Sequence, residues 1–212
     1  MEKITGKRQQ RTQENRKLIL DTAQELFNHA GYDQTTMSDI QKASGLSNGT
    51  IYHLFKSKQA ILEGIYEQYF RPDIGLCENL EEKIKEPLPY IVDFLNSFER
   101  QWMAAGSAVS TNIYLIFQGD EFADEKKDKG IHSETYSLYG PTAQKELRNF
   151  LTEVDRIGGL RDDVTPESAL DCIFIFGRGL LFSWSLTKGS YDLVEWAKPL
   201  WKTFLPSFFR TE

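Results

Sequence analysis

Residues 48–58 gather side chains that suit contact with a polyanion. They are small, able to hydrogen-bond, or basic, and comprise Asn48, Gly49, Thr50, Tyr52, His53, Lys56 and Lys58. Amide, hydroxyl and imidazole groups can read base edges. A glycine near a helix N-terminus lets the backbone approach a phosphate, and lysines neutralise phosphate charge. The segment therefore predicts contact with nucleic acid.

A helix-turn-helix is expected to hold this segment in place. Thr36 and Asp39 have the spacing of a capping box at a helix N-terminus, with an acid that suits the positive helix end. Gly45 then permits the positive φ of a tight turn, and Ser47 caps a third helix over roughly residues 48–55. Two short helices joined by such a turn make a helix-turn-helix.

The flanking pattern supports this arrangement. Apolar residues between positions 15 and 30 recur at the spacing of one face of an amphipathic helix, and Gly31 marks its end. The third helix is expected to turn Ile51, Leu54 and Phe55 inward, which leaves its polar residues outside.

The charge of the chain is unevenly spread. The formal net charge is -6, yet residues 1–58 contain nine Lys and Arg against six Asp and Glu, a net of +3. The remaining residues carry 16 basic against 25 acidic side chains. An acidic body with a basic N-terminal unit can stay soluble and still meet nucleic acid on one face.

The run TTMSDIQKASGLSNGTIYHLFKSKQAIL resembles the DNA-binding domain of the TetR family of bacterial transcriptional repressors. It carries T-x-x-D-I, then A-x-G-x-S-x-G-T-x-Y-x-x-F, then K-x-x-L/I-L, and the resemblance extends from Ile19 through Tyr66. It implies a DNA-contacting set of Thr36, Ser47, Asn48, Gly49, Thr50, Tyr52, His53, Lys56 and Lys58. It also implies a basic arm beside the minor groove, formed by Lys3, Lys7, Arg8 and Arg11.

Within that set the resemblance places Asn48, Thr50 and His53 at bases. The phosphates would be held by Thr36, Tyr52, Lys56 and Lys58. Each position also has a plainer interpretation. Thr36 would cap a helix without DNA, as would Ser47, and a tyrosine or histidine on this helix could simply pack or face solvent.

The rest of the chain is expected to be helical. A fourth helix from about residue 58 runs into Arg71-Pro72 without a linker, so the two parts share a helix. Further helices are expected over residues 88–105, 109–117, 133–157 with a break at Gly140-Pro141, 166–187 and 193–208. Thr165-Pro166 caps the penultimate one; its Ile173–Phe176 run could be a strand on composition alone, but capping and length favour a helix.

The expected fold class is therefore all-α. An N-terminal three-helix DNA-binding domain, residues 1–58, is joined by a connecting helix to a larger helical ligand-binding and dimerisation domain, residues 59–212. The resembled family pairs its last two long helices with their copies in a second subunit, which implies a homodimer. Candidate interface residues are Gly177, Gly179, Trp184, Leu193, Trp196, Leu200, Trp201 and Phe204.

Most aromatic residues fall after residue 58. They predict a helical core, or a small-molecule effector pocket with apolar walls and few polar groups. Candidate pocket residues are Phe98, Trp102, Tyr114, Phe117, Gln118, Tyr136, Tyr139, Phe174 and Arg178.

Enzymatic chemistry is not indicated. His132 is the one histidine outside the DNA-binding part, so no set of base, nucleophile and orienting group can be proposed. Residues 176–179 lack the strand that precedes a phosphate loop, and the acidic run 120–128 lacks the pattern of a calcium loop. Cys77 and Cys172 form no Cys-x-x-Cys pair, so neither a metal nor a cofactor is expected.

No N-terminal signal is indicated, and residues 172–186 are shorter than a membrane span and contain Arg178, so a cytoplasmic location without membrane contact is expected. The expected function is a homodimeric repressor that a small-molecule effector releases from double-stranded operator DNA. The alternative is an architectural or protein-interaction factor of the same fold without a small-molecule switch.

Overall fold

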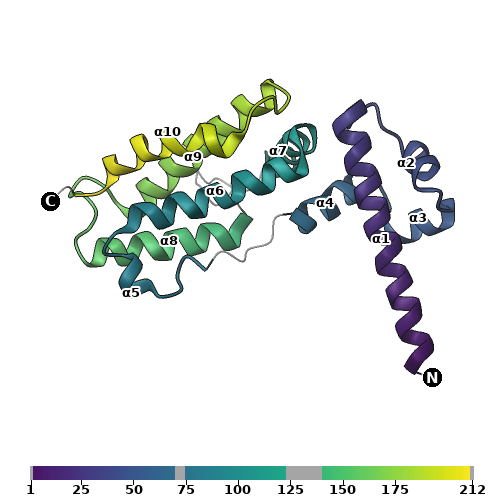
Figure 1. Cartoon of the computed structure of the whole chain (residues 1–212), viewed down its shortest axis with the longest axis horizontal. Helices are drawn as coiled ribbons and strands as arrows, with labels where there is room; N and C mark the ends of the chain where they lie inside the picture. The colour runs from purple at the N-terminus through teal and green to yellow at the C-terminus, as the bar shows by residue number, and fades with distance from the viewer. Residues whose placement is uncertain (1, 70–74, 123–139, 211–212) are drawn as a thin grey trace.

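The computed structural model describes residues 2–69, 75–122 and 140–210. Three helices lie at one end of the molecule, α1 (Glu2–Ala30), α2 (Met37–Ser44) and α3 (Asn48–Leu54), and α4 (Lys58–Tyr69) leads from them toward the other end (Figure 1). The bundle at the other end comprises α5 (Leu80–Lys83), α6 (Pro87–Ala105), α7 (Ser107–Phe122), α8 (Gly140–Arg156), α9 (Pro166–Leu186), α10 (Leu193–Phe204) and the 3-10 turn η2 (Leu205–Phe208). The all-α prediction is confirmed.

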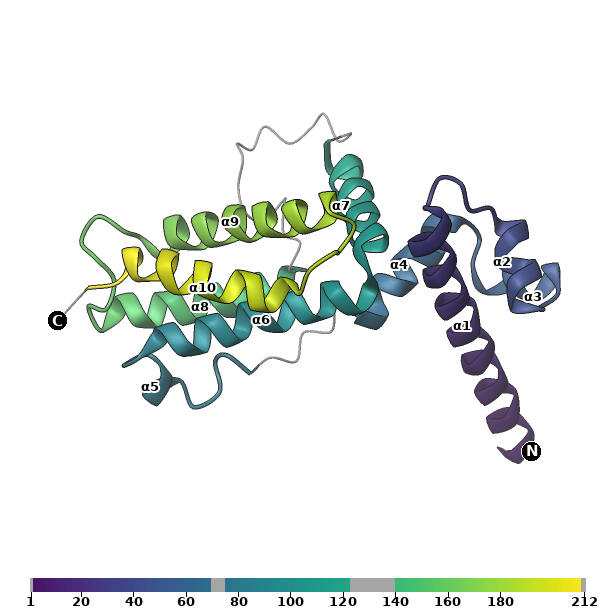
Figure 2. The same ribbon diagram turned by 45° about the horizontal axis from the view of Figure 1, so that its top comes forward.

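The bundle is organised around α6. Figure 2 shows α6, α8, α9 and α10 running alongside one another, with α7 set across the end that faces α4. α6 buries one broad apolar face, which includes Phe94, Leu95, Phe98 and Trp102. Within the described residues, the β pairing is confined to one bridge, between Leu160 and Phe209.

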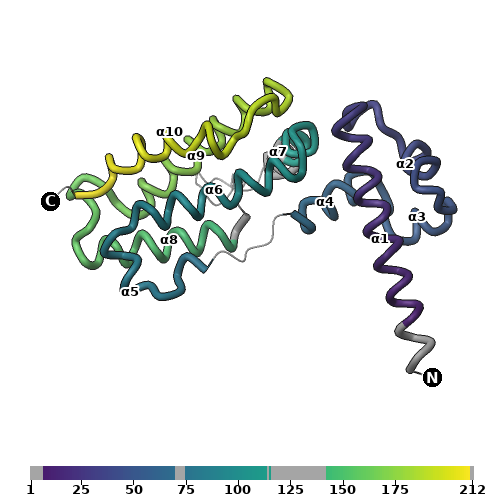
Figure 3. Tube along the Cα trace, in the orientation of Figure 1, coloured from purple at the N-terminus to yellow at the C-terminus, as the bar shows by residue number. Residues whose placement is uncertain are grey.

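α1 begins at Glu2, well before the predicted start at residue 15. Residues 7–14 are exposed and consist mostly of Gln, Glu, Lys and Arg, which form helices readily but leave no apolar stripe. Figure 3 shows this half of α1 projecting away from the packed helices. The predicted arm is therefore helical backbone, on which Lys7, Arg8 and Arg11 are exposed.

The other predicted bounds are close to the observed ones. α7 extends to Phe122, beyond the predicted 117, and α8 begins at Gly140, where a break had been predicted. Residues 133–139 lie outside the described residues. α10 ends at Phe204 because Pro206 lacks the N–H that would continue it, and the chain tightens into η2. The short helix α5 was not predicted.

α9 is long and apolar enough to cross a membrane by length and composition alone. The sequence argument considered only residues 172–186, whereas the whole helix has 21 residues and meets the length requirement. It nevertheless packs as a core helix against α8, α7 and α10, and buries Ile173, Phe174, Leu180 and Leu181. The bundle thus accounts for the apolar residues on the buried face of α9.

Candidate nucleic-acid interface

The start of α2 is fixed by the predicted capping box. The Thr36 hydroxyl oxygen accepts from the Asp39 N–H at 3.2 Å, and the Asp39 carboxylate accepts from the Thr36 N–H at 2.9 Å. The same hydroxyl donates to that carboxylate at 2.6 Å, and this bond is the main reason that the pKa of Asp39 is lowered. Thr36 remains exposed, so its capping role is confirmed and its phosphate contact stays a prediction.

The turn between α2 and α3 follows the predicted chemistry. Gly45 has φ +68 and ψ 9, and its N–H donates to the Gln41 carbonyl at 3.1 Å. A Cβ there would meet nothing within 4 Å, so the positive φ, not lack of room, favours glycine. Ser47 then caps α3, because its hydroxyl accepts from the Thr50 N–H at 3.2 Å.

α3 is anchored on one side and open on the other. Ile51 is 0% exposed and Phe55 2% exposed, and both join a core with Ile40 of α2 and apolar residues of α1 and α4. Leu54 is only half-buried. On the opposite side Tyr52 is 45% exposed. Asn48, Gly49 and His53 are also exposed and Thr50 is half-buried, so the predicted outward set lies on one open face.

The two lysines after α3 differ in their surroundings. Lys56 is exposed, and its Nζ donates to the Tyr52 carbonyl at 2.8 Å. Lys58 is half-buried: its Nζ donates to the Tyr32 carbonyl at 2.6 Å and lies 4.1 Å from the centroid of the Tyr32 ring. That ring packs edge-on against Phe27 at 5.0 Å. Lys58 thus fastens α4 to the end of α1, a structural role that the sequence reasoning missed.

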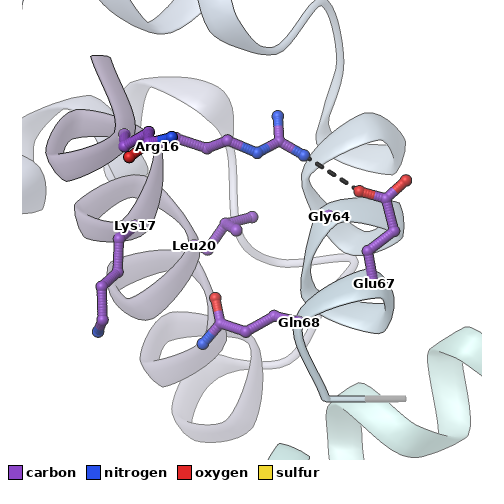
Figure 4. A pocket seen from close by; sticks show the side chains of 7 residues that line it. Arg16, Lys17, Leu20, Gly64, Glu67 and Gln68 are labelled. Carbon is purple, nitrogen blue, oxygen red and sulfur yellow. Dashed lines mark hydrogen bonds and ion pairs between the residues drawn. The ribbon is translucent and has the colours of Figure 1, made fainter. Parts of the chain in front are cut away.

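A shallow groove of about 430 Å³ lies between α1 and α4, where the two helices approach closely. Figure 4 shows Arg16 of α1 reaching across to Glu67 of α4, with an N–O distance of 3.2 Å. A Cβ on Gly64 would lie 2.8 Å from Leu20 and 3.0 Å from Phe55, so this close approach favours glycine. The contact holds α4 against α1 of the helix-turn-helix end.

The predicted pocket residues are only partly described. Phe98, Trp102 and Phe174 are each at most 2% exposed within the bundle core, and half-buried Arg178 donates to the Phe174 carbonyl at 3.3 Å. Tyr114, Phe117 and Gln118 lie on α7, but their side chains are not among those described. Tyr136 and Tyr139 lie outside the described residues. The pocket stays a prediction.

Sequence reasoning missed two buried polar groups on α6. Glu99 is 4% exposed, and its Oε1 accepts from Trp201 Nε1 at 2.6 Å. Burial raises the pKa of Glu99 from 4.5 to about 7. In the described part of the chain, Glu99 Oε2 and the Oδ1 of buried Asn96 have no hydrogen-bond partner. No local signal distinguishes these residues from exposed polar ones.

Several predicted interface residues lie in the protomer's own core. Leu193 is 1%, Trp201 0% and Trp184 3% exposed, and Trp184 Nε1 donates to the Tyr191 carbonyl at 2.9 Å. Gly177 is buried, Leu200 and Phe204 are half-buried, and Gly179 and Trp196 are exposed. Because Trp184 and Trp201 are buried within the single chain, they offer little surface to a partner subunit.

α9 instead presents an exposed stripe that the sequence reasoning mostly missed. Its apolar members are 56%, 52% and 70% exposed: Ile175, Phe182 and Leu186. Gly179 falls between them, and the exposed Cys172 precedes them on the same face. The stripe could have been predicted from the sequence, because its members are spaced three and four residues apart along one helix.

α2, the turn at Gly45 and the open face of α3 define a helix-turn-helix. Residues 19–65 match the sequence profile described as bacterial regulatory proteins, tetR family. The transcriptional regulator AcrR of Shigella flexneri is 41% identical over 84 residues, which span 40% of this chain and 38% of that protein. Over its helix-turn-helix the chain is therefore similar to transcriptional regulators of the TetR family, and it spans well under half the length of AcrR.

Solved structures extend the likeness to the whole fold. NalD of Pseudomonas aeruginosa, described as the secondary repressor of a multidrug efflux pump, superposes with a TM-score of 0.64 at 17% identity, covering 96% of this chain and 100% of that one. FadR of Bacillus subtilis in complex with stearoyl-CoA superposes with a TM-score of 0.57 at 21% identity, covering 90% and 98%. These likenesses concern the fold.

Proposed function

We propose that the protein is a homodimeric repressor whose α3 helices enter the major groove of operator DNA. The observation that carries the proposal is the open face of α3. Ile51 and Phe55 fix the helix in the core, whereas Asn48, Tyr52 and His53 point away from it and have no role in the fold's interior. Recognition helices read base edges with exposed groups of this kind on a rigidly held helix.

DNA contact divides among the predicted residues by chemistry. Asn48, Thr50 and His53 meet bases, while Tyr52 and Lys56 hold phosphates. Lys58 keeps its hydrogen bond to the Tyr32 carbonyl and so holds α4 against the end of α1. Phosphate contacts position a protein without reading sequence, whereas base contacts supply the specificity.

Dimerisation follows from the exposed stripe of α9. A second copy of the chain would cover Ile175, Phe182 and Leu186, and the small Gly179 lets the paired helices approach closely. Contiguous apolar surface of this kind marks an interaction site. A dimer also fits DNA, because recognition helices about 34–36 Å apart occupy successive major grooves. The proposed domain boundary remains at residues 58 and 59.

The larger domain is proposed to bind a small-molecule effector. The FadR structure of similar fold contains stearoyl-CoA, and a closed pocket would also leave Phe98, Trp102 and Phe174 inaccessible to solvent. An effector releases DNA only to the extent that it binds the DNA-free state more tightly. The protein acts in the cytoplasm, where operator DNA lies.

Mapping of the protein's binding sites on genomic DNA tests this function. A repressor is expected at a few sites beside promoters, and deletion of the gene should raise transcription from them. Many dispersed sites without transcriptional change would favour the architectural alternative. Absence of DNA binding even at low salt, where phosphate contacts are strongest, would contradict both.

A further inference from the structure

The end of α1 is hydrogen-bonded to the corner between α6 and α7. Gln24 Nε2 donates to the carbonyls of Ala104 at 2.9 Å and Ala105 at 3.1 Å. Asn28 Nδ2 donates to the Ala105 carbonyl at 2.8 Å. The last carbonyls of a helix have no partner within it, so α1 supplies partners for the end of α6.

Asn28 also holds the beginning of α7. Its Oδ1 accepts from the Val109 N–H at 3.2 Å, so one amide group joins the C-terminus of α6 to the N-terminus of α7. The corner is shaped around this amide. Gly106 has φ +91, and a Cβ there would lie 2.3–2.5 Å from the Asn28 amide atoms.

The same contact includes the connecting helix. The Tyr69 hydroxyl, near the end of α4, donates to Gln24 Oε1 at 2.7 Å. Gln24 and Asn28 are four residues apart and therefore share one face of α1. The other sides of α1 carry Phe27 and Ile19, which pack in the core with α2 and α3. The corner is thus linked to the recognition helix through a single rigid helix.

We propose that Gln24 and Asn28, here termed the α1 latch, are positioning residues that couple the state of the larger domain to the helix-turn-helix. If the corner moves, the latch either carries α1 with it or loses its part-buried hydrogen bonds to the backbone of Ala105 and Val109. Unpaired buried groups are costly, so the corner and α1 move together. This proposal rests on the proposed function, because it requires that DNA binding depends on the larger domain.

Coupling is reciprocal, so DNA must affect the corner as much as the corner affects DNA. The experiment uses the full chain and a duplex that the wild-type protein selects from a random DNA pool. Hydrogen exchange of a peptide spanning residues 103–113 is measured with and without this duplex. In the wild type, DNA is expected to change exchange there by about fivefold or more, the lower range of typical couplings.

The Gln24→Ala/Asn28→Ala variant is expected to bind the duplex and to lose this DNA-induced change. His29→Ala is the matched control, since His29 is an exposed neighbour on α1 and should behave as the wild type. Gln24→Glu keeps the shape of the side chain but removes the N–H groups that donate to Ala104 and Ala105. This variant replaces the double variant in the experiment if the double variant does not fold.

Two results would overturn the latch. One is a DNA-induced change that persists at wild-type size in folded variants, and the other is its absence in wild-type protein that binds the duplex. A wild-type protein that selects no duplex would instead contradict the proposed function.

Discussion

Replacing the buried carboxyl of Glu99 with an amide should stabilise the protein above neutral pH. Glu99 is 4% exposed, and it has only the Trp201 indole N–H as a hydrogen-bond donor in the described structure. Burial raises its pKa from 4.5 to about 7. Glu99→Gln keeps an acceptor for Trp201 and removes the need to bury a charge.

The magnitude follows from the two pKa values. The unfolded carboxyl ionises near its ordinary pKa of 4.5, and the folded one ionises only near 7. Below pH 4.5 both states are protonated and the group costs nothing. Between pH 4.5 and 7 the unfolded carboxyl ionises while the folded one stays protonated, so stability is lost as the pH rises over this range and levels off above 7. One pKa unit is about 1.4 kcal/mol, which gives a loss of about 3 kcal/mol.

Urea unfolding followed by circular dichroism at pH 5, 6, 7 and 8, at one protein concentration, measures this difference. The excess stability of Glu99→Gln over the wild type should grow from about 1 kcal/mol at pH 5 to about 3 kcal/mol at pH 8. Glu82→Gln, at an exposed position, is the control and should show no such growth. An excess that stays constant with pH, or a variant less stable at pH 8, would refute the reasoning.

Three further substitutions test the proposed α9 interface, the α1–α4 contact and the cap of α2. Phe182→Glu should convert the proposed dimer into a folded monomer, because this side chain is 52% exposed in the single chain; sedimentation equilibrium checks this, and an intact dimer would count against the α9 interface. Gly64→Ala should cost up to about 2 kcal/mol in urea unfolding, since crowding of its Cβ against Leu20 at 2.8 Å costs about 1–3 kcal/mol and the helix propensity of alanine offsets about 1 kcal/mol. Thr36→Ala should cost about 1 kcal/mol by loss of the cap, measured in the same way.

The elements around α3 could be predicted because their signals are local. Thr36, Gly45 and Ser47 each act within a few residues, and the structure confirms all three roles. The early start of α1 could not be predicted from periodicity, because a polar helix in solvent buries no face. Propensity alone is a weak guide to where such a helix begins.

Side-chain roles in the bundle depend on contacts between distant segments. Trp201 looked available to a partner, yet it lies against Glu99, 102 residues earlier in the chain. Lys58 meets Tyr32, 26 residues earlier, and Asn28 meets Ala105, 77 residues later. Residue type predicts that such polar groups form hydrogen bonds when buried. Only the packed fold determines with which residues they form them.

The central claim is that the open face of α3 reads DNA sequence. Selection of duplexes from a random pool by the wild type, Asn48→Ala, His53→Ala and Lys56→Ala tests it most directly. The account predicts that the first two variants relax or change the preferred bases, each by about 1–3 kcal/mol at the affected position. Lys56→Ala should weaken all duplexes alike and reduce the salt dependence. Wild-type motifs and affinities in both Asn48→Ala and His53→Ala would contradict it.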